Sequence, residues 1–139
     1  MKRVIAAVFA LSVTVLLLTG CMGDVVDVTV VLKNSTEHEI SAVIFNIPQS
    51  SGTYSPMNGI ITADAEPLKP GEERETVIGF VDTDFGNSGS ALIGLEDYDG
   101  ASDTLATAKG WVVLRRGTNR FVITHDGEAF VITAGSDAP

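Results

Sequence analysis

The sequence predicts an all-β protein, an antiparallel β-sandwich of about seven to eight short strands that follows a cleaved signal peptide. Three observations predict this fold. After residue 24, short runs rich in β-branched residues recur, turn-forming residues separate them, and no stretch shows sustained helical periodicity. Of the 139 residues, those beyond residue 20 suit one domain with a hydrophobic core.

Valine-rich and isoleucine-rich runs mark the first strands. Residues 25–32 contain five valines, and residues 34–35 begin a turn. A second strand is expected over 39–47, then a loop rich in Pro, Ser, Gly and Asn over 48–59, and a short third strand over 60–62.

Strong turn signals bound the later strands. The dipeptide Pro70-Gly71 breaks the chain before a strand expected over 75–81. After it come expected strands over 90–96 and 104–114, turns at 97–100 and 115–118, and two final strands.

The last two strands form a hairpin around Asp126-Gly127. This dipeptide favours a two-residue type I′ loop, because both positions need a positive φ. We expect the larger, more aromatic face of the hairpin to point into the core. That face carries the expected pairs His125–Glu128, Ile123–Phe130 and Phe121–Ile132, while Val122 and Val131 lie on the other face.

The N-terminal segment has the architecture of a secretion signal. Lys2 and Arg3 precede an apolar run over 4–18, which is shorter than the roughly 20 residues of a membrane-spanning helix. The motif Leu18-Thr19-Gly20-Cys21 resembles the lipobox of bacterial lipoproteins. The resemblance implies cleavage between Gly20 and Cys21, a diacylglycerol on the Cys21 thiol and an acyl chain such as palmitate on the new amine. The alternatives are an ordinary cleaved signal followed by a chance cysteine, and an uncleaved anchor.

This resemblance divides the chain into four parts. Residues 1–20 are the signal peptide, 21–24 the lipidated N-terminus and a short tether, 25–135 the β-sandwich, and 136–139 a disordered tail. Three residues separate Cys21 from the first strand, so the domain would lie within roughly 15 Å of the bilayer surface. Met22 occupies the position where an aspartate would favour retention in the inner membrane. We therefore expect an exported protein of the bacterial cell envelope, in the outer membrane and facing the periplasm.

A second resemblance concerns the β-sandwich itself. The run from Val28 to Asn34, followed by Leu68-Lys69-Pro70-Gly71-Glu72, is similar to immunoglobulin-like modules of bacterial surface proteins. The resemblance implies an immunoglobulin-like fold and implies no activity.

Reversal of direction at each strand would sort the loops between two ends of the sandwich. The loops 48–59, 82–89 and 115–118 would share one end with the N-terminus, and Arg115 and Arg116 would face the membrane there. The loops 34–38, 64–73, 97–103 and 126–127 would share the distal end. The expectation fails if Lys109-Gly110 forms a turn that splits the 104–114 strand.

The net charge and the composition of the chain indicate which classes of binding partner are favoured and which are excluded. The formal net charge is −9, and removal of Lys2 and Arg3 with the signal makes the exported part more negative. Such a field repels nucleic acid and favours basic or cationic partners. Cys21 is the only cysteine, so no intramolecular disulfide can form, and no cofactor is expected.

The acidic turn that ends in Gly100 suggests a calcium site. It does not fit the helix-loop-helix calcium motif, because that alignment places Leu95 and Ala106 at ligand positions. A looser site at the distal end would draw on Asp97, Asp99, Asp103 and Glu66. Ordinary turn chemistry explains the same residues.

No set of residues predicts catalysis or a metal centre. His38 and His125 are the only histidines and are expected to be structural or solvated, and no Gly-x-Ser-x-Gly elbow occurs. Asn34-Ser35-Thr36 matches a glycosylation sequon but is interpreted as a turn. Trp111 is expected in the core or on partly covered surface.

The sequence thus predicts a lipid-anchored envelope lipoprotein that acts as a non-catalytic structural or protein-interaction module. Its partners would be the membrane, through Cys21, and an envelope protein. The alternative is a ligand-binding or calcium-binding envelope lipoprotein that uses the acidic distal loops.

Overall fold

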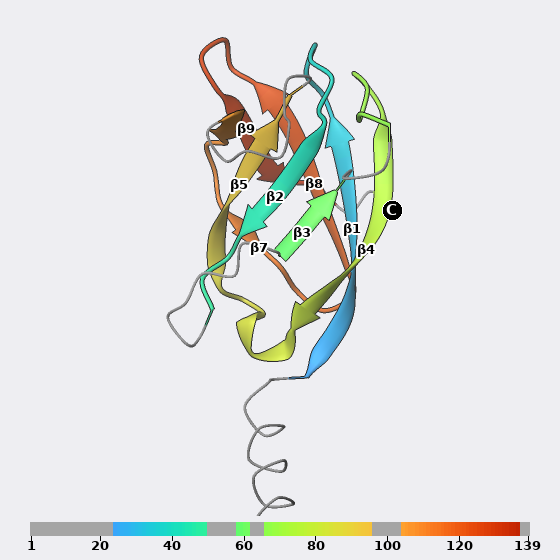
Figure 1. Cartoon of the computed structure of the whole chain (residues 1–139), viewed down its shortest axis with the longest axis vertical. Helices are drawn as coiled ribbons and strands as arrows, with labels where there is room; N and C mark the ends of the chain where they lie inside the picture. Colours follow the sequence, from blue (N-terminus) through green and yellow to red (C-terminus); the bar gives the residue numbers. More distant parts are fainter. Residues whose placement is uncertain (1–23, 50–57, 62–65, 96–103, 137–139) are drawn as a thin grey trace, which may run out of the picture.

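The computed structural model describes residues 24–49, 58–61, 66–95 and 104–136 (Figure 1). Within these ranges the chain forms strands and one short 3-10 helix, η1, which confirms the all-β prediction. The elements are β1 (Val25–Asn34), β2 (Ala42–Asn46), β3 (Asn58–Ile61), β4 (Glu73–Val81), η1 (Asp82–Asp84), β5 (Ser88–Gly94), β6 (Leu105–Thr107), β7 (Val112–Val113), β8 (Thr118–His125) and β9 (Phe130–Ala134).

Two sheets pack face to face as a β-sandwich (Figure 1). One sheet has the strand order β4-β1-β8-β9, and the other has the order β3-β2-β5-β6 with β7 also paired to β5. The pairing is antiparallel as predicted, except that β1 and β8 run parallel. This parallel pair brings the first strand of the domain beside the C-terminal hairpin, and no local signal in the sequence indicates it.

The core lies between the sheets and follows from the alternation along each strand. In β1, Val28, Val30 and Leu32 are fully buried, and Phe121 and Ile123 of β8 are also buried in the same core. Full burial of a side chain of this size stabilises the fold by about 1.5–3 kcal/mol. The largest side chains in this core include Phe45, Phe80, Ile40, Ile47, Leu68, Ile93, Leu114 and Ile132.

The expected strand over 104–114 is divided at Lys109-Gly110. The Lys109 N–H donates to the Phe130 carbonyl, and the Lys109 carbonyl accepts from the Ile132 N–H, so this segment leaves β5 and contacts β9. Gly110 has φ +108°, and a Cβ there would lie 2.3 Å from the Ile132 carbonyl oxygen. Only glycine fits this approach. Because β6 and β7 both run antiparallel to β5, the chain keeps its direction across the break.

The C-terminal hairpin has the predicted faces but not the predicted register. His125 pairs with Phe130 and Ile123 with Ile132, so the loop contains four residues rather than two. The reason is the Asp126 carboxylate, which accepts the N–H groups of Glu128 and Ala129 and holds a wider turn. A shift of two residues leaves every side chain on its expected face.

The described loops lie at the ends that strand reversal predicts. At the N-terminal end, the Asp24 carbonyl accepts from the Asp82 N–H, and Arg116 forms an ion pair with Asp82. At the opposite end, the Asn34 carbonyl accepts from the Gly71 N–H. The rings of His38 and His125 meet there at a centroid distance of 5.4 Å.

Candidate functional site

The residues predicted for lipid attachment and for calcium fall mainly outside the described parts of the chain. Gly20 and Cys21 lie outside them, and so do Asp97, Asp99 and Asp103. Glu66 is described: its side chain is 86% exposed, its carboxylate lies 4.0 Å from the Lys69 ammonium, and its backbone carbonyl accepts from the Arg74 guanidinium at 2.6 Å. Within the described ranges, no group of three or more His, Cys, Asp or Glu side chains could hold a metal ion. The described ranges also contain no helix long and apolar enough to cross a membrane.

The two histidines form an aromatic cluster with Phe130. Each imidazole meets the Phe130 ring edge-on, at centroid distances of 5.8 Å for His38 and 5.0 Å for His125. The His125 Nδ1 accepts the Gly127 N–H at 3.1 Å. This bond uses the Nδ1 lone pair within the turn. Both histidines are exposed, and their described ring contacts are with each other and with Phe130.

Asn34 is also structural. Its side chain is fully buried, and its Nδ2 donates to the carbonyls of His38 and Leu68, both at 2.8 Å. Its Oδ1 accepts the N–H and the hydroxyl of Thr36. The amide that a glycosylation sequon would present to solvent is thus used inside the turn, as the interpretation of residues 34–36 as a turn requires.

Two carboxylates with lowered pKa values support turns at the same end. Hydrogen bonds from Lys109 and then from the Ala129 and Glu128 N–H groups hold the pKa of Asp126 far below its usual range. The Lys69 N–H and the Arg74 guanidinium lower the pKa of Glu72. These contacts are local and structural.

Trp111 was expected in the core or on partly covered surface, and the structure places it outside the core on exposed surface. Its side chain is 75% exposed, because Val112 and Leu114 point into the core and leave Trp111 on the opposite face. The alternation of the two neighbouring apolar residues was the signal that could have placed it.

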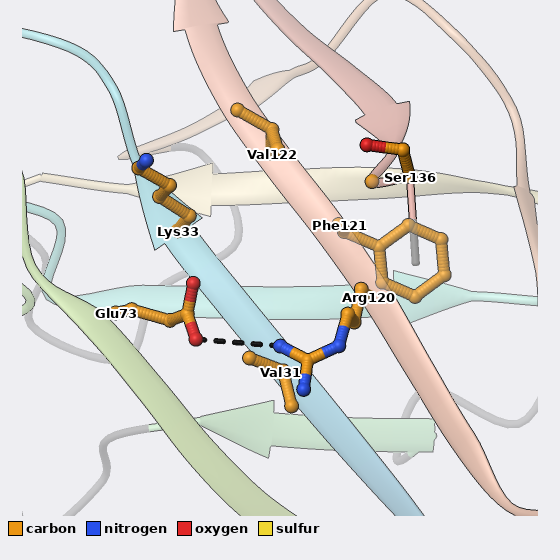
Figure 2. Close-up of a pocket in the computed structure, with 8 residues that line it drawn as sticks. Val31, Lys33, Glu73, Arg120, Phe121, Val122 and Ser136 are labelled. Atoms are coloured by element: carbon orange, nitrogen blue, oxygen red, sulfur yellow. Dashed lines mark hydrogen bonds and ion pairs between the residues drawn. The ribbon is translucent and has the colours of Figure 1, made fainter. Parts of the chain in front are cut away.

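A groove lies on the outer face of the sheet β4-β1-β8-β9 (Figure 2). It has a volume of about 390 Å³, within the size range of small-ligand sites. Three strands and the segment after β9 supply its walls. The side chains around it are Val31, Lys33, Glu73, Arg120, Val122 and Ser136, with Phe121 and Gly135 completing the lining.

Arg120 crosses the centre of this groove. Since β1 lies between β4 and β8, the guanidinium of Arg120 must reach across β1 to contact Glu73, at 3.3 Å (Figure 2). Val31 points outward from β1 beneath this pair and is only 4% exposed. The aliphatic part of an arginine can cover apolar surface in this way while its charged end stays in water.

The groove lining carries two cations, Lys33 and Arg120, and one carboxylate, Glu73, and Glu75 lies beside it opposite Val31. The Lys33 side chain forms no hydrogen bond or ion pair with any described residue, and the only described polar partner of the Arg120 guanidinium is Glu73. Two cations and one carboxylate suit the binding of an anion, and the groove lining contains no histidine or cysteine. Sequence reasoning missed this site, because it depends on the parallel pairing of β1 with β8.

Comparisons with known proteins found solved structures that align with most of the chain, at low sequence identity and low TM-score. No protein-family model and no curated protein matches the sequence. Among solved structures, a non-hemolytic pneumolysin from Streptococcus pneumoniae aligns with 81% of the chain at 8% identity and TM-score 0.40. Suilysin from Streptococcus suis aligns with 81% at 8% identity and TM-score 0.36. The chain spans 24% of the length of each of these two proteins.

A third solved structure is similar over its whole length. CBM25-1 of the β/α-amylase from Paenibacillus polymyxa aligns with 84% of the chain and 99% of its own length, at 13% identity and TM-score 0.40. At these TM-scores the likenesses carry no argument about function, so the functional proposal depends on the chain's own residues.

Proposed function

We propose that the protein is an exported bacterial lipoprotein, anchored by acyl chains on Cys21, whose β-sandwich is a non-catalytic interaction module. Its partner is another component of the cell envelope. The lipobox motif at residues 18–21 motivates the anchor, and the outer membrane, facing the periplasm, is its proposed location.

One observation supports this proposal most directly. The Asp24 carbonyl accepts the Asp82 N–H at 2.8 Å, and β1 begins at Val25. Only Met22 and Gly23 therefore separate Cys21 from a residue bonded into the domain. Two extended residues and their flanking bonds span roughly 10 Å, so lipid on Cys21 would hold the sandwich against the membrane by its N-terminal end.

Lipid attachment is tested with the Cys21→Ser variant. We expect the unchanged chain to incorporate a labelled palmitate and to sediment with membranes, and the variant to incorporate none and to remain in the soluble fraction. Ser35→Cys in a Cys21→Ser background provides a matched control, because it restores a thiol at a position that no lipobox precedes. Membrane attachment of the Cys21→Ser variant would contradict the proposal.

Orientation is tested with single cysteines at the two ends of the sandwich. Thr83 in η1 lies at the N-terminal end, and Ser35, after β1, lies at the opposite end. In intact envelopes we expect a thiol reagent to label Ser35→Cys faster than Thr83→Cys. Detergent should remove the difference. Equal labelling in the membrane would mean that the N-terminal end does not face the bilayer.

A further inference from the structure

The outer groove places two cations on neighbouring strands. In the parallel pairing of β1 with β8, Val31 lies beside Arg120 and Lys33 lies beside Val122. Lys33 and Arg120 are therefore diagonal neighbours on one face, at a separation of roughly 7–8 Å that one bound anion can bridge for side chains of this length. The arrangement needs no movement of the backbone.

The charge of the groove favours a monoanion. Glu73 lies opposite Lys33 on β4 but contacts Arg120, at 3.3 Å through one nitrogen. Within the groove lining, two cations and this carboxylate leave one net positive charge, and Glu75, opposite Val31 on the same face of β4, adds a second carboxylate beside the groove. A second negative charge on the ligand would meet Glu73, and like charges at short range oppose binding. A carboxylate fits this balance better than a doubly charged phosphate.

The other surfaces of the groove suit an aliphatic group beside that charge. Val122 gives it apolar surface beside Val31, which the Arg120 stem covers, and Ser136 adds a hydroxyl at one side (Figure 2). The Gly135 N–H donates to the Arg120 carbonyl at 2.8 Å, which fixes this side to β8. A Cβ at Gly135 would lie 3.2 Å from the Arg120 Cβ, so glycine keeps the arginine stem free of crowding.

We propose that this groove binds the carboxylate of an aliphatic ligand, with Lys33 and Arg120 as the anion-binding pair. The carboxylate can belong to the end of a peptide chain or to a free short-chain acid. The site does not depend on lipid attachment, so a failure to bind carboxylates would not contradict the anchoring of Cys21, and an unmodified Cys21 would not contradict the site.

The test is an NMR titration of the purified Cys21→Ser chain with three probes. The probes are acetyl-Ala-Val with a free carboxylate, the same dipeptide as its C-terminal amide, and isovalerate. We expect the free dipeptide to shift the backbone amide signals of Val31, Lys33, Val122 and Ser136, and the amide probe to bind about tenfold more weakly or not at all. Stronger binding by the dipeptide than by isovalerate identifies a chain end, and equal binding identifies a free acid.

Variants assign the effect to the two cations. Lys33→Gln should weaken binding of the free dipeptide about tenfold, since Lys33 has no described partner whose loss would disturb the fold. Arg120→Lys keeps the charge but loses the planar fork, and it should weaken binding as well. Lys69→Gln, at an exposed lysine outside the groove, should leave it unchanged. Equal binding of acid and amide, an unaffected Lys33→Gln variant, or no binding of either carboxylate at millimolar concentration would overturn the proposal.

Discussion

Replacement of Asn34 by alanine tests how the loop after β1 is held. The buried amide makes four hydrogen bonds, two through Nδ2 and two through Oδ1. After the substitution, the Leu68 carbonyl still accepts a hydrogen bond from the Ile40 N–H, and the His38 carbonyl still accepts one from the Thr36 hydroxyl. The Thr36 N–H keeps no partner among the described residues. Four bonds at about 1 kcal/mol each predict a loss of about 3–4 kcal/mol of unfolding free energy.

This loss is a large fraction of the stability of a domain of this size, about 5–15 kcal/mol. At roughly 4 °C for each kcal/mol it lowers the melting temperature by about 12–16 °C. Urea unfolding followed by circular dichroism measures it. Ser35→Ala is the matched control and should change stability by less than about 0.5 kcal/mol, because the Ser35 side chain is exposed. A loss below about 1 kcal/mol for Asn34→Ala would refute the reasoning.

Three further predictions concern the turns and the exposed tryptophan. Gly110→Ala should destabilise the domain far more than Gly117→Ala in urea unfolding, because both positions have positive φ but only the Cβ at 110 meets a backbone oxygen, at 2.3 Å; equal losses would contradict the close approach. The pKa of Asp126 is lowered in the folded state, so its contribution to stability is present above its unfolded value of about 3.9 and is lost as the pH falls. Asp126→Asn should therefore lower stability at pH 7 and flatten its decline toward acid pH, and an unchanged pH profile would contradict this. The fluorescence of Trp111 should resemble that of free tryptophan in water and should be quenched by iodide, because the residue is 75% exposed. A blue-shifted emission that iodide does not quench would contradict this exposure.

Side-chain alternation predicted the core because it depends on local backbone geometry. Phe121, Ile123, Phe130 and Ile132 were expected on the inner face of the last hairpin and are buried there. The loop length was not predictable from Asp126-Gly127 alone, since the Asp126 carboxylate accepts two backbone N–H groups and stabilises a wider turn. The pattern therefore determined which face is buried, and a side-chain contact determined the register.

The groove illustrates the limit of local reasoning. Arg120 and Lys33 come from distant parts of the chain, and they share a face only because β1 pairs with β8 in parallel. Long-range pairing leaves no turn signal between the strands. The break at Gly110 likewise results from contact with Ile132, a residue of another strand. The sequence predicted the sandwich and its candidate anchor, and the structure supplied the groove.

The most direct test of the lipid-anchored account is mass spectrometry of the N-terminal peptide of the chain extracted from membranes. The account predicts a peptide that begins at Cys21 and carries a diacylglycerol on the thiol together with an acyl chain on the amine. A mature chain that begins at another residue, or one with an unmodified Cys21, would contradict it.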